Sequence, residues 1–365
     1  MVNTPSPELA ASRAPRRANV AGLGLIGGSI GLGLAERGWV VSGTDVDAAR
    51  VQRAIDMGII VSAGLDPDAE ITFVATPVLA LADGVRAALV QTRGIVTDVG
   101  SVKAGVVAAI DDARFVGGHP MAGSELEGLD GADGSMFEGA IWVLTPSAAT
   151  ADTTFSAVAA VVAELGAEVI ALPADRHDQV VAVISHVPHL TAATLMGLAA
   201  TRAEEHAALL RLAAGGFRDM TRIASGHPAI WLDICAQNKV AILSALDDLI
   251  AGLGTMREVV DADDRDGLLE LLRRAREARS NLPSRVNQPS ELAELRIPIP
   301  DRSGAAAGIF TLAAELGVNI ANFEVVHSVE GSRGIAIVLV DAASAEVYRG
   351  GLLARGYKPA VQRLQ

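Results

Sequence analysis

The sequence feature that most constrains the fold of this chain is a glycine-rich motif near its start. Gly22, Gly24 and Gly27 form the pattern G-x-G-x-x-G between a short apolar run, Val20-Ala21, and a helix-forming stretch, Ser29–Ala35. Glycines at these positions permit a tight turn, let the backbone approach a pyrophosphate and allow a helix to pack closely on a strand. The motif therefore predicts strand, turn and helix at the opening of a dinucleotide-binding domain.

An acidic residue follows the next predicted strand. Val40–Thr44 has strand character, and Asp45 comes directly after it, at the distance from the glycine motif expected for a carboxylate that binds ribose. Such a carboxylate accepts hydrogen bonds from ribose hydroxyls and repels a 2′-phosphate, which favours NAD over NADP. Arg50 lies near enough in sequence to keep NADP possible. The alternative interpretation is a glycine-rich turn beside a solvated aspartate.

Short β-rich runs alternate with amphipathic segments as far as Leu172. The predicted strands are Asn19–Gly22, Val40–Thr44, Ile71–Ala75, Ile95–Asp98, Phe115–Gly118, Ile141–Thr145 and Glu168–Ala171. The segments between them include Asp47–Met57, Val78–Val90 and Phe155–Leu165. This alternation predicts an α/β fold over residues 18–172, a Rossmann-type, doubly wound and mostly parallel sheet with helices on both faces.

The character of the sequence changes after Pro173. Residues 173–280 show helical periodicity and predict an all-helical domain, whose long Ala/Leu-rich segments need a partner inside the domain or, as we favour, across a homodimer interface. Residues 281–293 are rich in Pro, Ser and Asn and predict a linker. Residues 294–365 predict the order βαββαβ, which is typical of a ferredoxin-like domain.

Composition excludes several classes of function. The formal net charge is -13 and no long basic block is present, which argues against a nucleic-acid or anionic-membrane surface. The single cysteine, Cys235, excludes an internal disulfide framework and a Cys-rich metal site. The uncharged run Ala18–Ala35 is better explained by the glycine motif than by a membrane span. Residues 1–17 lack the apolar core of a signal peptide, so we expect a disordered tail on a cytoplasmic protein.

Three polar stretches stand out in this apolar chain. Thr97–Lys103 reads T-D-V-G-S-V-K and Gly118–Glu125 reads G-H-P-M-A-G-S-E, and each begins at the end of a predicted strand. Both are expected at the carboxyl edge of the sheet, where doubly wound folds bind ligands. The third, Gly216–Ala224, reads G-F-R-D-M-T-R-I-A in the helical region, with Arg218 and Arg222 one helical turn apart.

Together these stretches resemble the prephenate/arogenate dehydrogenases of tyrosine biosynthesis. The glycine motif followed by Gly28-Ser29, D-V-G-S-V-K, H-P-M-A-G-S-E, Ser185-His-Val-Pro-His189 and F-R-D-M-T-R occur in that order from about Ala18 to Arg279. The βαββαβ tail is similar to an ACT domain, a module that senses small molecules in many amino-acid biosynthetic enzymes. The resemblance implies oxidative decarboxylation of prephenate or arogenate with hydride transfer to NAD.

The resemblance also implies roles for single residues. His119 matches the catalytic histidine that accepts the proton of the substrate hydroxyl, and Ser101 matches the serine that orients it. Arg222 matches the arginine that grips a substrate carboxylate, which its planar guanidinium can do with two hydrogen bonds. His189 matches an active-site histidine, and Glu125 is expected to gate or order the pocket.

Other assignments are less direct. Asp219 is spaced to hold Arg222, and Arg218 is either a second clamp or a solvated arginine. His186 and His189 share a helix face, but no third ligand has compatible spacing, so no metal is expected. The residues expected to bind the cofactor are Gly22, Gly24, Leu25, Ile26, Gly27, Asp45, Thr76, Asp98 and Ser101.

Other readings of the sequence remain open. The substrate is prephenate or arogenate, and an aromatic amino acid is expected to act through the C-terminal domain. A different small-acid dehydrogenase would need a catalytic lysine in the helical region, where Lys239 lacks the surrounding pattern. A non-catalytic sensor of NAD and an amino acid is disfavoured because His119, Ser101 and Arg222 are all present.

Overall fold

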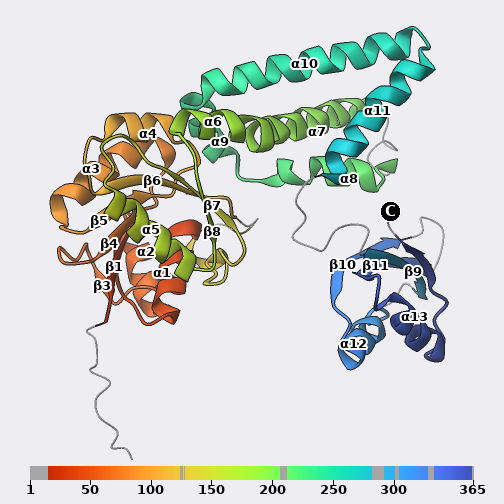
Figure 1. The fold of residues 1–365 in the computed structure, drawn as a ribbon, viewed down its shortest axis with the longest axis horizontal. Helices are drawn as coiled ribbons and strands as arrows, with labels where there is room; N and C mark the ends of the chain where they lie inside the picture. Colours follow the sequence, from red (N-terminus) through yellow and green to blue (C-terminus); the bar gives the residue numbers. More distant parts are fainter. Residues whose placement is uncertain are drawn as a thin grey trace, which may run out of the picture. The chain divides into compact units, whose positions relative to one another are not determined.

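The computed structural model describes residues 15–123, 126, 128–205, 212–281, 292–300, 304–327 and 333–363. The chain divides into two compact units, residues 1–252 and 253–365. The first unit contains an open sheet with flanking helices and the greater part of a helical segment (Figure 1). Within the second unit, the strands form a four-stranded antiparallel sheet.

The sheet of the first unit has the strand order β3-β2-β1-β4-β5-β6-β7-β8. Its strands are β1 Arg17–Ala21, β2 Val40–Thr44, β3 Ser62–Ala63, β4 Ile71–Val74, β5 Ile95–Asp98, β6 Phe115–Pro120, β7 Ile141–Thr145 and β8 Glu168–Ala171. The helices between them are α1 Leu25–Glu36, α2 Ala48–Asp56, α3 Leu81–Gln91, α4 Ala104–Ala109 and α5 Asp152–Glu164, with 3₁₀ turns η1 Val78–Ala80 and η2 Leu129–Gly131. The predicted mostly parallel sheet is confirmed, although β7 pairs antiparallel to β6 and the two-residue β3 was not predicted.

Alternating residues of single strands enter different cores, which places helices on both faces of this sheet. Phe73 of β4 packs in the cluster that includes Ile30 of α1, whereas its neighbour Val74 packs in the cluster that includes Val85 of α3. Successive side chains of a strand point to opposite faces. Each such side chain, fully buried, stabilises the fold by about 1.5–3 kcal/mol.

The first strand begins earlier than expected. Residues 1–17 were predicted to be a disordered tail, but Arg17 already pairs in β1, and residues 1–14 lie outside the described residues. Arg16 forms an ion pair with Glu70 and lies 3.8 Å above the ring of Trp39. Arg17 forms an ion pair with Asp66. These contacts fasten the segment to the sheet, a long-range effect that local composition does not reveal.

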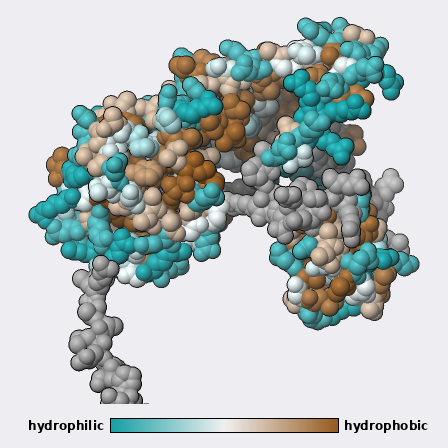
Figure 2. All heavy atoms as spheres, viewed as in Figure 1, coloured by the Kyte–Doolittle hydropathy of each residue, from teal (hydrophilic) through white to brown (hydrophobic). Residues whose placement is uncertain are grey.

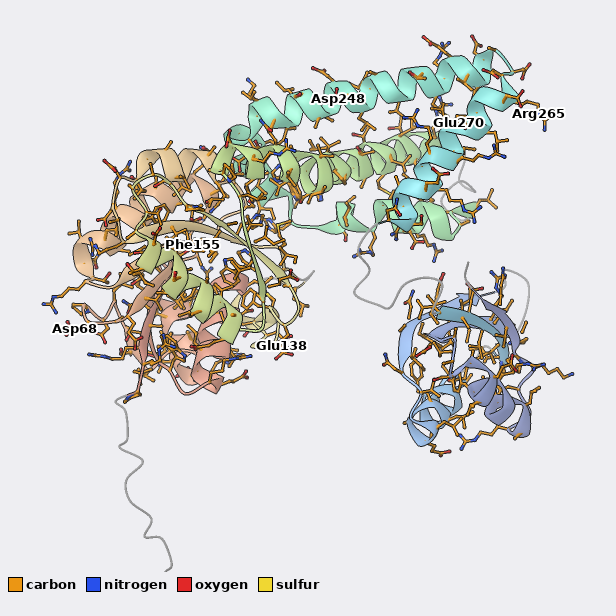
Figure 3. The ribbon with its side chains drawn as sticks, in the orientation of Figure 1. Asp68, Glu138, Phe155, Asp248, Arg265 and Glu270 are labelled. Atoms are coloured by element: carbon orange, nitrogen blue, oxygen red, sulfur yellow. The ribbon has the colours of Figure 1, made fainter. Side chains whose placement is uncertain are left out.

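The helical region is confirmed as all helix within the described residues. It comprises α6 Ala174–Val181, the π-helical turn η3 Ala182–His186, α7 Val187–Glu205, α8 Gly215–Thr221, the 3₁₀ turn η5 Arg222–Ser225, α9 Pro228–Gln237, α10 Lys239–Asp261 and α11 Arg265–Ser280. Charged residues such as Asp68 at the rim of the sheet and Asp248 on α10 are directed outward (Figure 3).

Apolar residues gather at the surface of this helical region (Figure 2). The exposed ones within the first unit include Val183, Ile184, Leu198, Val240, Leu243 and Ile250. By length and composition alone, the run Ala174–Arg202 resembles a membrane span, with a third of its most apolar window buried. The same run carries three histidines, of which His186 and His189 each line a pocket.

Within the second unit, the segment that follows α11 has the predicted βαββαβ order, which is confirmed. Its elements are β9 Leu292–Pro300, α12 Ala307–Leu316, β10 Ile320–His327, β11 Arg333–Asp341, α13 Ala345–Ala354 and β12 Ala360–Arg363, with the sheet order β10-β11-β9-β12. Tyr348 of α13 is buried, and its hydroxyl donates a 2.8 Å hydrogen bond to the carbonyl of Ile309 in α12. The predicted linker lies largely outside the described residues.

Candidate functional site

The glycine motif adopts a turn that only glycine can form. Gly22 has φ +99°, and a Cβ atom there would lie 2.5 Å from the carbonyl oxygen of Ala75. A Cβ atom on Gly27 would lie 1.9 Å from the carbonyl oxygen of Gly22. Gly24 caps α1 in extended backbone, so the first N–H groups of this helix face the loop. The motif therefore forms the close turn and open helix start that a pyrophosphate requires.

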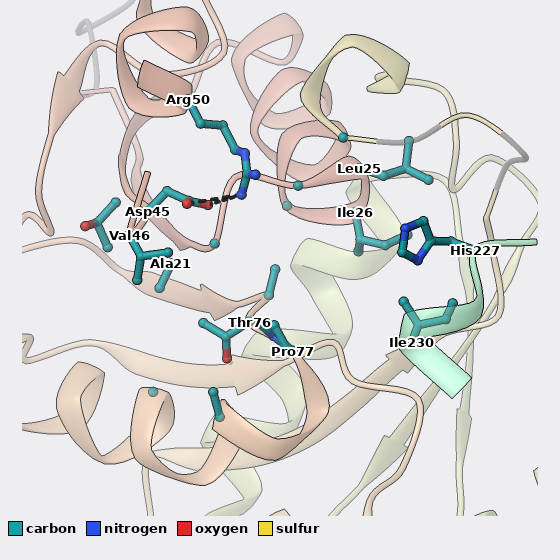
Figure 4. A pocket seen from close by; sticks show the side chains of 18 of the residues that line it. Ala21, Leu25, Ile26, Asp45, Val46, Arg50, Thr76, Pro77, His227 and Ile230 are labelled. Atoms are coloured by element: carbon teal, nitrogen blue, oxygen red, sulfur yellow. Dashed lines mark hydrogen bonds and ion pairs between the residues drawn. The ribbon is translucent and has the colours of Figure 1, made fainter. Parts of the chain in front are cut away.

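Asp45 is held rigidly at the end of β2. Its Oδ2 accepts a 2.8 Å hydrogen bond from the backbone N–H of Leu23, and its Oδ1 accepts one of 2.9 Å from Asp47. Arg50 donates from one nitrogen to both oxygens, at 3.1 and 3.2 Å. This ion pair closes one end of the cavity that His227 and Ile230 border at the other (Figure 4).

A cavity of about 1010 Å³ lies along the glycine motif. The predicted cofactor residues Gly22, Gly24, Leu25, Ile26, Gly27, Asp45 and Thr76 all line it. The buried hydroxyl of Thr76 has no hydrogen-bond partner among the described residues, so it is available to a ligand. Together with the glycine turn, this chemistry fits a dinucleotide.

A smaller pocket of about 280 Å³ contains His119. Its lining includes Ser101 after β5, His119 of β6, and Ser185 and His186 of η3. Trp231 of α9 lines both this pocket and the larger cavity, and it stacks on His189 with ring centroids 3.6 Å apart. The indole is therefore a shared wall between the two spaces.

His119 is linked to a second histidine and a carboxylate. Its Nδ1 lies 2.8 Å from Nε2 of His177, and Nδ1 of His177 lies 2.8 Å from Oδ1 of Asp178. Asp178 also accepts 2.8 Å hydrogen bonds from the backbone N–H groups of Lys103 and Ala104 at the start of α4. This chain joins β6, α6 and α4 beneath the smaller pocket.

Burial favours the neutral form of three histidines at the site, His119, His186 and His189. Burial holds the pKa of His119 well below its usual value, and the charges of His177, Lys103 and His186 act in the same direction. Burial lowers the pKa of His186 to about 4, with Asp178 opposing and His177 reinforcing the shift. Burial also lowers the pKa of His189. A neutral imidazole at position 119 can accept a proton near pH 7.

A buried ion pair supports the strand ends below His119. Lys103 and Asp98 are paired with no exposed side-chain surface, and Lys103 Nζ donates a 2.8 Å hydrogen bond to the carbonyl of Gly118. Burial lowers the pKa of Lys103, while Asp98 and Asp178 oppose that shift. Asp98 was expected to contact the cofactor. It lines neither space, because its carboxylate is used inside the protein.

The structure separates residues that were expected to act together. His189 and Arg222 line the larger cavity, whereas Ser101 and His119 line the smaller pocket. Ser101, also expected to contact the cofactor, is thus absent from the larger cavity. Among the described residues, His119 is hydrogen bonded to His177 and not to Ser101.

The two arginines expected to bind the substrate together, Arg218 and Arg222, also lie apart. Arg218 and Asp219 lie exposed on α8 and line neither space, while Arg222 begins the following 3₁₀ turn and does line the cavity. The change from α-helix to 3₁₀ geometry between them breaks the expected common face. Glu125 lies outside the described residues. The described residues include no group of three or more side chains placed to hold a metal ion.

Sequence reasoning missed His177 and Asp178. The only local signal was a run of polar residues, Arg176–Asp178, entering an otherwise apolar helical stretch. Such a run is usually a solvated helix face. Here both side chains are buried, and His177 reaches a residue 58 positions away.

Comparisons with known proteins identify relatives of this chain. The sequence profile of the prephenate dehydrogenase nucleotide-binding domain matches residues 30–171, and that of the prephenate dehydrogenase dimerization domain matches residues 173–274. Prephenate dehydrogenase of Bacillus subtilis is 33% identical over 333 residues, covering 87% of this chain and 90% of that protein. Since 87% of the chain is more than its first 280 residues, the aligned region must extend into the C-terminal segment.

Two solved structures are also similar. Prephenate dehydrogenase from A. aeolicus, crystallised with hydroxyphenyl propionate and NAD⁺, is 27% identical with a TM-score of 0.69, covering 74% of this chain and 100% of that one. Synechocystis arogenate dehydrogenase is 29% identical with a TM-score of 0.64, covering 72% of this chain and 98% of that one.

Proposed function

The chain belongs to the prephenate dehydrogenase family of NAD-dependent oxidoreductases, and from this premise we propose how its residues carry out the reaction. The reaction is the oxidative decarboxylation of prephenate to 4-hydroxyphenylpyruvate. The observation that carries the proposal is the position of His119, in a pocket that shares the wall residue Trp231 with the cavity along the glycine motif. Burial holds the pKa of His119 well below its usual value, which favours the neutral imidazole.

The larger cavity holds NAD. The backbone at Gly22–Gly27 and the N-terminus of α1 would face the pyrophosphate, and Asp45 would face the adenosine ribose. Thr76 offers its free hydroxyl from the opposite wall. When bound, the nicotinamide supplies the acceptor for a hydride.

His119 acts as the acceptor for the proton of the substrate hydroxyl. As the ring alcohol becomes a carbonyl, its C–H leaves as hydride and its O–H proton moves to the imidazole. Carbon dioxide then departs and leaves its bonding electron pair in the ring, which becomes aromatic as the oxygen recovers a proton from His119. Ser101, in the same pocket, is positioned to hydrogen bond to the reacting oxygen or to the imidazole.

The acidic substrate needs cationic contacts. The described lining of the smaller pocket contains no arginine or lysine, whereas Arg222 lies in the larger cavity beyond Trp231. We therefore place a substrate carboxylate beside Arg222, with the ring of the substrate reaching past Trp231 to His119. No substrate contact is proposed for Arg218 and Asp219, since both lie exposed on α8 and line neither space. The role expected for Glu125, which is to gate or order the pocket, stays a prediction from the sequence.

Arogenate is the second candidate substrate. Its support is the similarity to Synechocystis arogenate dehydrogenase, which is 29% identical to this chain, whereas the prephenate dehydrogenase of A. aeolicus is 27% identical. The two substrates differ in whether the side chain carries an amino or a keto group. Arogenate therefore needs a partner for an ammonium group that prephenate does not.

The helical region is proposed to pair two copies of the chain. Residues 173–274 match a dimerization domain, and the first unit exposes Val183, Ile184, Leu198 and Val240 on its helices. Packing these apolar side chains against a second copy of the chain would remove them from water. Light scattering should give twice the mass of the chain, 37.5 kDa. A monomer at micromolar concentration would contradict this.

The C-terminal segment is proposed to be an ACT domain that senses an aromatic amino acid. The support is its βαββαβ order with the strand order β10-β11-β9-β12. We expect tyrosine to inhibit the full chain and to leave a variant lacking residues 294–365 unaffected. Equal inhibition of both would contradict this.

Four rate measurements test the reaction itself. Production of NADH or NADPH is followed by absorbance with prephenate or arogenate, each with NAD⁺ or NADP⁺. We expect prephenate with NAD⁺ to be the best pair, and His119→Asn to lower kcat by about 10²–10⁴-fold while NAD binding is retained. If arogenate were oxidised and prephenate were not, arogenate would be the substrate. An unchanged kcat in the His119→Asn variant would refute the role of His119.

A further inference from the structure

Asp178 is a fixed acceptor at the base of the smaller pocket. Its Oδ1 accepts from the backbone N–H of Lys103 and its Oδ2 from that of Ala104, each at 2.8 Å. The side chain is almost fully buried, with 6% of its surface exposed. Because both oxygens already act as acceptors for backbone N–H groups, the carboxylate also accepts in the remaining contact, and Nδ1 of His177 donates its N–H.

This contact determines which nitrogen of His177 carries hydrogen. A neutral imidazole has one N–H donor and one bare nitrogen. With Nδ1 donating to Asp178, Nε2 is bare, and it lies 2.8 Å from Nδ1 of His119. Two bare nitrogens would repel at this distance, so Nδ1 of His119 carries the hydrogen and donates it.

We propose that His177 and Asp178 are positioning residues that set the tautomer of His119, leaving its Nε2 bare to receive the substrate proton. The other tautomer of His119 would hold hydrogen on Nε2 and could accept nothing there. The hydrogen bond made by one ring nitrogen decides the state of the other. This inference rests on the proposed role of His119 as proton acceptor.

The groups around the histidine pair preserve this arrangement. Lys103 approaches from the start of α4, His186 from η3 and Asp178 from α6, and Asp98 pairs with Lys103 behind them. The positive charge of Lys103 opposes a further positive charge on His119. A protonated His177 would instead donate to Nδ1 of His119 and reverse the chain, which removes the acceptor.

The direct test is the tautomer of His119 in the wild-type protein. Nitrogen-15 NMR of histidine-labelled protein at pH 7.5 separates protonated from bare ring nitrogens, and the His119→Asn variant identifies the signals of His119. We expect a protonated Nδ1 and a bare Nε2. A His119 protonated on Nε2 overturns the inference and leaves the proposed reaction standing.

Two variants at one position then test the effect on the reaction. His177→Asn retains an N–H group for Asp178 but is too short to reach His119, whereas the carbonyl oxygen of His177→Gln can accept from Nδ1 of His119. We expect His177→Asn to lower kcat by about 10²–10³-fold, since a wrong tautomer of a catalytic histidine costs up to about 10⁴ elsewhere. The KM values for prephenate and NAD⁺ should change less than threefold.

The glutamine variant is the matched control. We expect His177→Gln to recover at least tenfold in kcat over His177→Asn and to restore a protonated Nδ1 in the NMR spectrum. Equal losses in both variants, or losses confined to KM, would show that His177 only supports the fold. If wild-type protein shows the expected tautomer yet oxidises neither prephenate nor arogenate, the proposed function fails and the tautomer assignment stands.

Discussion

The buried pair of Lys103 and Asp98 gives a prediction whose size can be worked out from its contacts. Lys103→Met keeps a long unbranched side chain but removes the ammonium group that pairs with Asp98 and donates to the carbonyl of Gly118. Asp98 would keep only the backbone N–H groups of Gly100 at 2.9 Å and Gly118 at 3.3 Å. A fully buried carboxylate would then lack a counter-charge.

Removing one partner of a buried ion pair costs about 3–5 kcal/mol. The lowered pKa of Lys103 reflects a burial that disfavours its charged form. Part of the attraction between Lys103 and Asp98 therefore only offsets the cost of desolvating the ammonium group. The lower half of that range, about 3–4 kcal/mol, is therefore expected. At about 2–4 °C per kcal/mol for a unit of this size, the melting temperature should fall by roughly 6–16 °C.

Urea unfolding followed by circular dichroism measures the loss of unfolding free energy. The double variant Asp98→Asn/Lys103→Met is the control, because a neutral amide needs no counter-charge. We expect it to be more stable than Lys103→Met alone by at least 1 kcal/mol. A Lys103→Met protein within about 1 kcal/mol of wild type, or a double variant no better than the single one, would refute the reasoning.

Three further outcomes are expected. Asp45→Ser removes the carboxylate that repels a 2′-phosphate and releases Arg50 to bind it, so kcat/KM for NADP⁺ should rise about tenfold and that for NAD⁺ should fall; an unchanged ratio would contradict the role of Asp45. His186 has its pKa lowered to about 4 in the folded state, so the unfolded chain binds its proton first as the pH falls below 6.5, and stability is lost from there towards pH 4. At pH 5 this amounts to about 2 kcal/mol, and urea unfolding at pH 7.5 and 5 should show a smaller loss for His186→Gln; equal losses would exclude His186 as a source. Gly27→Ala puts a Cβ atom 1.9 Å from the carbonyl of Gly22, and calorimetry should show NAD⁺ affinity reduced at least tenfold; wild-type affinity would mean that the turn tolerates a side chain.

The sequence by itself determined the architecture and the cofactor end of the site. Alternating apolar runs predicted seven of the eight strands of the first sheet to within about two residues, and only the two-residue β3 was missed. The βαββαβ order of the C-terminal segment was predicted in full. The glycine motif could be interpreted because its effect is local. A positive φ at Gly22 and a missing Cβ at Gly27 are properties of single residues and their immediate turn.

Only the tertiary structure decided which side chains meet at the reacting end. In β6, His119 lies within hydrogen-bond distance of His177 from the helical region. His189 and His119 line separate spaces that share Trp231. Asp98 was expected to contact the cofactor, but it forms a buried ion pair with Lys103 instead. Contacts of this kind depend on how helices dock against a sheet edge, which follows from packing over the whole unit. A local pattern of polar residues does not encode which distant partner will satisfy them.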